Sequence, residues 1–173
     1  MLEFLHAEYF KKQKAEEAKR HRVTLFRCVP KSNDQAAGKC LQVFAREGYN
    51  RNSTTTWDVD EDDKDKCRGV AAKIWHYNAE QEPVIAECEW DVNDPIIKAR
   101  YAKSLGLEVH EAEKLNVQSC YFFGVPIKKV RERWGVLLID TKQIDFVQKD
   151  RQKQTLRRFA GYINRLIEDW ENE

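Results

Sequence analysis

The sequence lacks any long hydrophobic run, and no apolar stretch approaches the roughly 20 residues that a membrane-spanning helix needs. It also has almost no net charge, because 30 Lys and Arg residues stand against 29 Asp and Glu, for a formal value of +1. A dedicated nucleic-acid-binding protein would carry a clear basic excess, so we expect no nucleic-acid partner. The seven glycines are scattered, which excludes a glycine-rich phosphate loop.

Catalytic and metal-binding signatures are missing as well. The sequence contains none of the motifs G-x-S-x-G, H-E-x-x-H and G-x-G-x-x-G, and no two of its four histidines are spaced i, i+4. The five cysteines are odd in number and include no C-x-x-C pair, so they form neither a disulfide framework nor a zinc-ribbon spacing. We therefore expect no metal, no cofactor and reduced thiols typical of a cytoplasmic protein.

What is present fits one globular domain. The chain has 173 residues, of which 34% are charged and 11% are aromatic, too many aromatics for a disordered chain. Hydrophobic periodicity predicts helices interspersed with short strands and hairpins, and therefore an α+β fold with an antiparallel sheet. The strands are expected at 23–29, 41–45, 53–57, 84–87, 118–127 and 133–141, and the helices at 2–20, 66–75, 95–105 and from about 145 to near the end.

The segment Asp58–Asp65 holds six acidic residues and one lysine. Its D-x-D-x-D start resembles a calcium loop, but Asp63 stands where that loop needs Gly and Gly69 stands where it needs Glu. We expect instead that these acidic residues precede a helix, with Asp65 as its N-cap.

A clearer helix start follows at Asp94, where an N-cap residue precedes Pro95. Gly106 marks the end of this helix. Its spacing predicts that Ile96, Ile97 and Tyr101 form the buried side.

The last helix carries an apolar seam with spacings of three and four residues, which is typical of helix pairing. The first three seam residues are alternatively explained by packing on the sheet of their own domain, whereas the last two lie beyond a compact sheet and are expected to join a partner chain. The predicted dimerisation residues are Leu156, Phe159, Ile163, Leu166 and Trp170.

The first ten residues are apolar and aromatic, and Lys11 and Lys12 follow abruptly. The order differs from a signal peptide, where charge precedes the apolar stretch. We consider two explanations: the end of a longer helix, or the juxtamembrane end of a membrane span upstream in a longer protein.

At the level of the whole chain, the sequence resembles a GAF domain. The segments that carry the likeness are VTLFRCVP, LQVFAREG, CRGVAAKIWHYNAEQEPVIAE, DPIIKARYAKSLGL and, best of all, QSCYFFGVPIKKVRERWGVLLIDTKQ. The resemblance implies a central antiparallel sheet of about five to six strands, terminal helices on one face and short helices over a ligand pocket on the other. It divides the chain into a terminal helix (1–22), a core (23–141) and a C-terminal helix (142–173).

The resemblance also implies a sensory or interaction module that dimerises through its terminal helices and is not an enzyme. The asparagine–lysine motif of cyclic-nucleotide GAF domains and a bilin-cysteine motif are both missing. A reductase branch of the family acts on free methionine sulfoxide with cysteines in the pocket segments. Cys67, Cys88 and Cys120 lie in roughly those regions, but their local motifs do not match.

A pocket in such a fold would be lined by aromatic walls and one arginine able to hold an anion. The predicted ligand-binding residues are Trp57, Arg68, Trp90, Tyr101 and Tyr121. The alternative is that the aromatic residues belong to the core and that Arg68 is solvated. The functional hypotheses are a cytoplasmic sensory module with a small ligand, a structural or protein-interaction module without one, and a thiol reductase.

Overall fold

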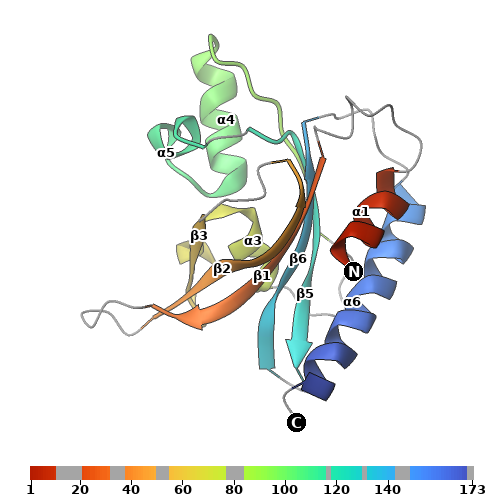
Figure 1. Ribbon diagram of the computed structural model, residues 1–173. Coiled ribbons are helices and arrows are strands. Elements are labelled where there is room, and N and C mark those ends of the chain that lie inside the picture. Colours follow the sequence, from red (N-terminus) through yellow and green to blue (C-terminus); the bar gives the residue numbers. More distant parts are fainter. Residues whose placement is uncertain are drawn as a thin grey trace.

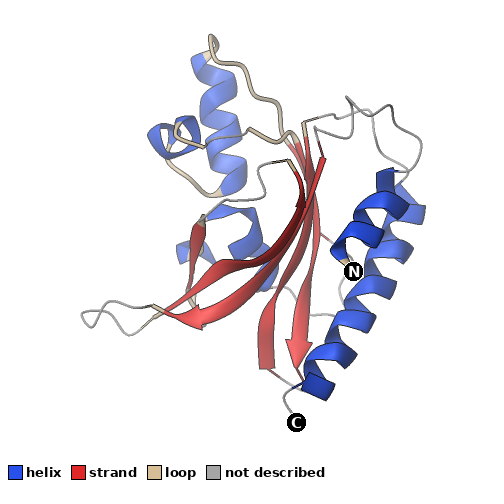
Figure 2. Cartoon of the chain, viewed as in Figure 1, coloured by secondary structure: helices blue, strands red, loops and turns tan. Residues whose placement is uncertain are grey.

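The chain folds around a single antiparallel sheet (Figures 1 and 2). A computed structural model describes residues 1–10, 21–31, 38–49, 55–76, 84–115, 118–129, 132–142 and 149–170. Within these residues the sheet has six strands in the order β3-β2-β1-β6-β5-β4. The strands are β1 (His21–Pro30), β2 (Lys39–Gly48), β3 (Thr56–Val59), β4 (Val84–Glu87), β5 (Tyr121–Lys129) and β6 (Glu132–Thr141).

Helices cover the two faces of the sheet unequally, as Figure 1 shows. The terminal helices α1 (Leu2–Phe10) and α6 (Lys149–Trp170) lie together on one face. The short helices lie on the other face, with α4 and α5 toward one end of it. These are the 3-10 helix η1 (Lys64–Lys66), α3 (Gly69–Trp75), α4 (Pro95–Leu105) and α5 (Val109–Glu113). The predicted fold class and this division of the helices are confirmed.

Alternation along the central strands separates two apolar cores. On β6, Leu137 and Ile139 pack against α1 and α6, whereas Val136 and Leu138 pack beneath the short helices. Successive side chains of a strand point to opposite faces, so one strand supplies both cores.

Each predicted strand corresponds to a strand of the structure, but the bounds differ: β2 extends beyond the predicted 41–45, and β5 begins three residues after the predicted start at 118. The strand β3 differs as well. This strand begins at Thr56, and its register pairs Trp57 with Leu41 of β2. Residues 53 and 54 of the predicted strand lie outside the described residues.

The predicted N-cap at Asp65 is wrong. Asp63 caps the 3-10 helix by accepting a 2.9 Å hydrogen bond from the backbone N–H of Asp65. Helix α3 starts only at Gly69, and its N-cap residue Arg68 makes no side-chain capping bond. In the turn before η1, the Asp60 carboxylate accepts hydrogen bonds from the backbone N–H groups of Asp62 and Asp63. These acidic residues therefore stabilise that turn and do not cap α3.

Helix α4 starts and ends where the sequence predicts. The Asp94 carboxylate accepts bonds from two backbone N–H groups of the first turn, and Gly106 ends the helix with φ at 71°. The predicted buried side is only partly right, because Ile96 is 63% exposed. Ile97 is partly buried and Tyr101 is buried as predicted, and Ala102 and Leu105 complete the buried side.

The apolar seam of α6 divides into a buried and an exposed part. Leu156 and Ile163 are fully buried in the core of their own domain, and Phe159 packs against that core. Leu166 is 54% exposed and Trp170 is 62% exposed. The first part therefore packs within the domain, as the alternative explanation holds, and only the last two residues face outward.

Helix α1 ends at Phe10 and β1 begins at His21, so residues 11–20 of the predicted first helix lie outside the described residues. No helix in the described ranges combines the length and apolar character that crossing a bilayer requires.

Candidate functional site

A cavity of about 300 Å³ lies between the sheet and the short helices. Its size falls at the lower end of the range of small-molecule pockets. Apolar side chains form most of the wall, and charged side chains gather at the part of the floor formed by β1, β2 and β6. The apolar lining includes Phe26, Trp57, Val70, Ala71, Leu105, Leu115, Phe122 and Leu138.

Strand alternation brings the charged residues into the cavity. On β1, Val23 and Leu25 pack toward the terminal helices, and Arg22 and Thr24 line the cavity. Asp140 of β6 is the residue opposite Arg22 in the antiparallel register. Two residues separated by 118 positions in the chain thus become direct neighbours.

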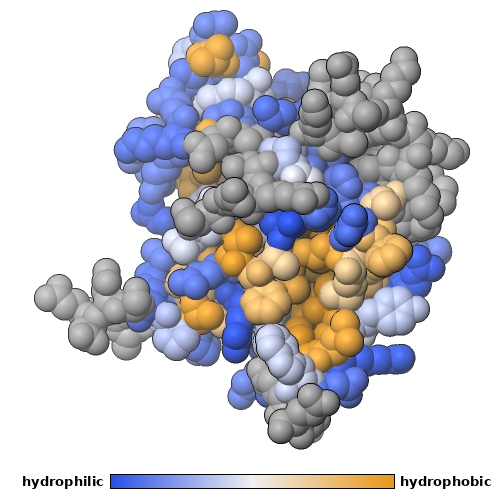
Figure 3. Space-filling model, in the orientation of Figure 1, coloured by the Kyte–Doolittle hydropathy of each residue, from blue (hydrophilic) through white to orange (hydrophobic). Residues whose placement is uncertain are grey.

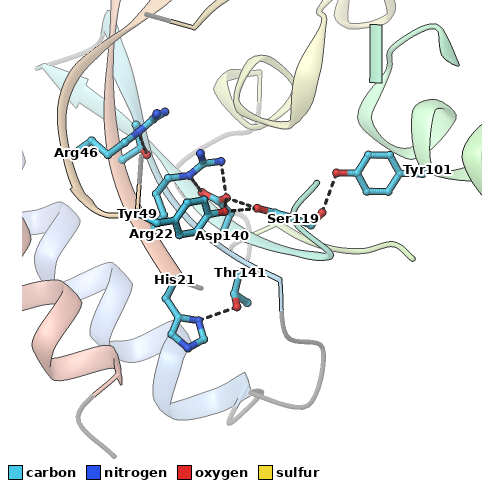
Figure 4. A network of polar contacts seen from close by, with 9 residues as sticks. His21, Arg22, Arg46, Tyr49, Tyr101, Ser119, Asp140 and Thr141 are labelled. Carbon is cyan, nitrogen blue, oxygen red and sulfur yellow. Dashed lines mark hydrogen bonds and ion pairs between the residues drawn. The ribbon is translucent and has the colours of Figure 1, made fainter. Parts of the chain in front are cut away.

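Asp140 is the centre of a polar network, shown in Figure 4. Its two oxygens accept hydrogen bonds from Arg22 Nε at 2.8 Å and Arg22 Nη2 at 2.6 Å. The Ser119 hydroxyl donates to the same carboxylate at 2.5 Å, and the Tyr49 hydroxyl donates at 3.2 Å. The carboxylate is fully buried: Oδ1 accepts the bond from Arg22 Nε, and Oδ2 accepts the other three.

The network shifts the pKa of Arg22 and of Tyr49. Burial alone lowers the pKa of Arg22, but the negative charge of Asp140 and the hydrogen bonds to it outweigh burial and raise that pKa. The Arg22 guanidinium also lies 4.8 Å from the centroid of the Tyr49 ring. Burial and the nearby carboxylate both raise the pKa of Tyr49, so its hydroxyl stays protonated and donates.

Arg46 of β2 is the second guanidinium on the cavity floor. Its Nε donates to the Thr24 hydroxyl at 2.9 Å. Burial, followed by the positive charge of Arg22, lowers the pKa of Arg46 to about 10, and Asp140 offsets this only in part. The environment therefore disfavours this charge, although Arg46 is still protonated at neutral pH.

The roof of the cavity depends on a glycine. Gly69 has φ at 82°, in the left-handed region, and a Cβ there would lie 2.5 Å from Cε3 of Trp57. Glycine allows the indole to lie directly over the start of α3 and form part of the cavity wall.

Of the five residues predicted to bind a ligand, only Trp57 lines this cavity. Arg68 is half-exposed and does not line the cavity, although it forms an ion pair with Glu111, which does. Trp90 and Tyr101 pack edge to face with centroids 5.0 Å apart, and the Tyr101 hydroxyl donates to the Ser119 carbonyl at 2.9 Å. Both therefore have structural roles.

Tyr121 lies on the opposite face of the sheet, in the core with α1 and α6. Its neighbour Phe122 lines the cavity instead. Because successive side chains of a strand point to opposite faces, a shift of one residue moves a side chain to the other face of the sheet. The strand β5 is apolar on both faces, so its sequence does not show whether Tyr121 or Phe122 faces the cavity.

Arg22, Arg46 and Asp140 were not predicted from the sequence. For Asp140 the available signal is a charged residue that directly follows the buried run WGVLLI. Only the strand order shows that two of them meet.

None of the residues that line the cavity is a cysteine. Burial raises the pKa of Cys88 to about 11 and also raises the pKa of Cys67 and of Cys120. A raised pKa disfavours the thiolate that a reductase needs. Across the described ranges, no three His, Cys, Asp or Glu side chains are grouped closely enough to hold a metal ion.

Two solved photoreceptor structures resemble this fold along almost the whole chain. A far-red cyanobacteriochrome photoreceptor has a TM-score of 0.52 and 15% identity, over 97% of this chain and 84% of that one. The red light-absorbing state of a red/green cyanobacteriochrome has a TM-score of 0.52 and 11% identity, over 99% and 94%. A phycocyanobilin-bound GAF domain from a cyanobacterial phytochrome has a TM-score of 0.45 and 16% identity, over 95% and 92%.

Neither a family model nor a curated protein matches the sequence. At identities this low the structural likeness concerns the fold. The strand order, the terminal helices on one face and the short helices over a cavity on the other agree with that likeness. The chain therefore has a GAF-like fold, as its sequence resemblance predicts.

Proposed function

We propose that this chain is a sensory or regulatory GAF-like module that binds a small molecule in the cavity between the sheet and the short helices. The observation that carries the proposal is the cavity itself, in which apolar walls converge on a few fixed polar groups. The Asp140 network holds those polar groups in place without a ligand, so the site is largely formed in advance.

The module is proposed to act by binding and not by catalysis. Asp140, a candidate base, is already engaged in an ion pair with Arg22 and accepts hydrogen bonds from Ser119 and Tyr49. The described lining contains no His or Cys to act as a base or nucleophile. The high thiol pKa values also disfavour the methionine sulfoxide reductase alternative.

A sensory role agrees with the structures that share the fold, since the far-red cyanobacteriochrome is described as a photoreceptor. We propose that the module belongs to a larger signalling protein, acts in the cytoplasm or as the cytosolic part of a membrane protein, and passes ligand occupancy on through its terminal helices. Strands β1, β5 and β6 supply side chains both to the core beneath α1 and α6 and to the cavity floor. The same strands therefore connect the cavity with the terminal helices.

We further propose that the outward end of α6 forms a homodimer contact. Leu166 and Trp170 are exposed there, and the Trp170 ring lies 6.3 Å from the exposed Phe44 ring of β2. Figure 3 shows apolar surface gathered where the sheet meets α1 and α6. Sedimentation of the full chain should show a dimer, and Trp170→Asp should dissociate it. A strict monomer at high concentration contradicts this part of the proposal.

The ligand-binding function is tested by thermal denaturation with a panel of nucleotides and small metabolites. A ligand at 100 times its Kd stabilises the folded state by about 2.7 kcal/mol, which is about 5–11 °C in Tm for a chain of this size. Leu115→Trp fills the cavity from its half-buried edge and should abolish the shift.

Leu107→Trp, a matched change outside the cavity, should keep the shift. Stabilisation that persists in Leu115→Trp contradicts the site. If no compound stabilises the chain, the ligand-free interaction module becomes the better account.

A further inference from the structure

Two cysteines lie opposite each other where the edge strand of the sheet ends. Strand β4 is the last strand in the sheet order, and its pairing with β5 ends with Glu87 opposite Tyr121. The next residues in this antiparallel register are Cys88 and Cys120. The Cys88 backbone N–H donates a 2.8 Å hydrogen bond to the Cys120 carbonyl, so the pairing of the two segments continues through both cysteines.

The register places both cysteine side chains on one face of the sheet, because directly opposed residues of antiparallel strands share a face. This is the face of the short helices: Phe122, two residues after Cys120, lines the cavity, and Cys88 packs against the core on that side. The Cα atoms of such a pair lie about 4.5–5.5 Å apart. A disulfide spans about 4.4–6.8 Å between Cα atoms, so the backbone suits an Sγ–Sγ bond here.

The surroundings of the two thiols also place them together beneath α4. The Cys88 thiol forms a hydrogen bond with the side chain of Ser104, and the Cys120 sulfur accepts one from the backbone N–H of Trp90. Burial, followed by negative charge on Cys88 or Cys120, raises the pKa of Tyr101, so both sulfurs lie within electrostatic range of one hydroxyl. Both cysteines are free and partly exposed, and a small reagent can therefore reach them.

A second pair of cysteines in the sheet has a different arrangement. Cys28 of β1 lies opposite Leu41 of β2. Cys40 lies opposite Val29, so the two cysteines are one register step apart and point to opposite faces. Cys28 is nevertheless similar to Cys88, because each is partly exposed and burial raises the pKa of each to about 11. Cys28 is therefore a matched control for chemistry that needs an opposing cysteine.

We propose that Cys88 and Cys120 are a redox modification site, which closes to a reversible disulfide and ties β4 to β5 on exposure to a low-molecular-weight disulfide such as oxidised glutathione. One cysteine thiolate attacks a sulfur of the reagent, forms a mixed disulfide and releases one thiol. The second cysteine attacks the protein sulfur of that mixed disulfide and releases the second thiol. The two cysteines lose two electrons and two protons, and the disulfide bond of the reagent is reduced to two thiols.

Burial makes this exchange slow. It raises the pKa of both thiols, so that few thiolates are present at neutral pH, although a thiolate of high pKa is the stronger nucleophile. The pair therefore suits a response to a lasting change in redox conditions and not catalytic turnover. The site also adjoins the Asp140 network, because Ser119, the neighbour of Cys120, donates a hydrogen bond to that carboxylate.

Equilibration of the full chain with glutathione redox buffers tests the proposal. After exchange at roughly pH 8, where more thiolate forms, free thiols are blocked with iodoacetamide and the chain is digested with trypsin without reduction. Trypsin cleaves after Lys98 and Lys114, between the two cysteines, so a disulfide appears in the mass spectrum as one pair of linked peptides. Cys88→Ser, Cys120→Ser and the control Cys28→Ser are treated in the same way.

We expect the linked peptides in the unmodified chain and in Cys28→Ser. They should be absent from Cys88→Ser and from Cys120→Ser, and dithiothreitol should remove them. The disulfide closes the loop between residues 88 and 120 and should raise Tm by roughly 5–15 °C. This rise should occur only in the two chains that form the link.

The proposal is overturned if both thiols remain open to alkylation in the most oxidising buffer, or if the linked peptides form only after urea has unfolded the chain. A link between two chains, seen as a dimer on a non-reducing gel, overturns it as well. A link that leaves Tm unchanged overturns the tie between β4 and β5. Should a serine variant fail to fold, the mass spectrum of the unmodified chain still identifies the linked residues, and Cys88→Ala and Cys120→Ala replace the serine variants.

Discussion

Removing the buried carboxylate at the cavity floor is expected to destabilise the fold strongly. Asp140→Ala leaves the Arg22 guanidinium without its counter-ion, in a position where the Arg22 side chain is only 14% exposed. It also leaves the Ser119 and Tyr49 hydroxyls without their shared acceptor. Breaking a buried ion pair from one side costs about 3–5 kcal/mol. That loss lowers Tm by about 6–20 °C for a chain of this length.

The measurement is urea unfolding followed by tryptophan fluorescence. It is made on Asp140→Ala, on Arg22→Met and on the double variant Asp140→Ala/Arg22→Met. If the charges stabilise each other, the double variant should lose less than the sum of the singles by about 1–3 kcal/mol. Additivity to within about 0.5 kcal/mol would refute the reasoning. Glu61→Ala provides the control, because its pair with Lys39 is exposed and should be worth less than about 1 kcal/mol.

Three further changes test the fold. Leu156→Ala opens a hole in a fully buried site and should cost about 2–5 kcal/mol in urea unfolding, whereas Leu166→Ala on the exposed side of α6 should cost less than about 0.5 kcal/mol in the monomer. Asp94→Ala removes the α4 cap and should cost about 1 kcal/mol in the same assay; no loss would contradict the capping role. Backbone N–H bonds hold the pKa of Asp60 below its usual value, so its contribution to stability is present above the unfolded-state pKa and is lost as pH falls through the folded-state pKa. Asp60→Asn should therefore flatten the decline of stability below pH ~4, and an unchanged acid profile would contradict this.

Local signals in the sequence predict much of the fold. Asp94 with Pro95 and Gly106 specify both ends of α4 through short-range hydrogen bonds and backbone preferences, so that helix is found where expected. The strand 133–141 is equally clear because its apolar residues are continuous and charged residues flank it. These features depend on neighbours in the chain and need no knowledge of the sheet order.

The site depends on the sheet order and on strand phase, which the sequence does not specify. Arg22 and Asp140 become partners only because β1 lies beside β6. Tyr121 and Phe122 belong to a run that is apolar on both faces, so no alternation shows which of them faces the cavity. Trp57, predicted to bind a ligand, lines the cavity. Its close contact with Gly69 follows from a backbone conformation that the sequence permits but does not specify.

The most direct test of the account is an NMR spectrum of the tryptophan indole N–H groups during titration with a compound that stabilises the chain in the thermal panel. Trp57 lines the cavity, whereas Trp134 packs on the opposite core and Trp170 lies on the exposed end of α6. If the cavity is the ligand site, the Trp57 signal should shift saturably while the Trp134 and Trp170 signals stay in place. Shifts of Trp134 or Trp170 with an unmoved Trp57 signal would contradict the central claim.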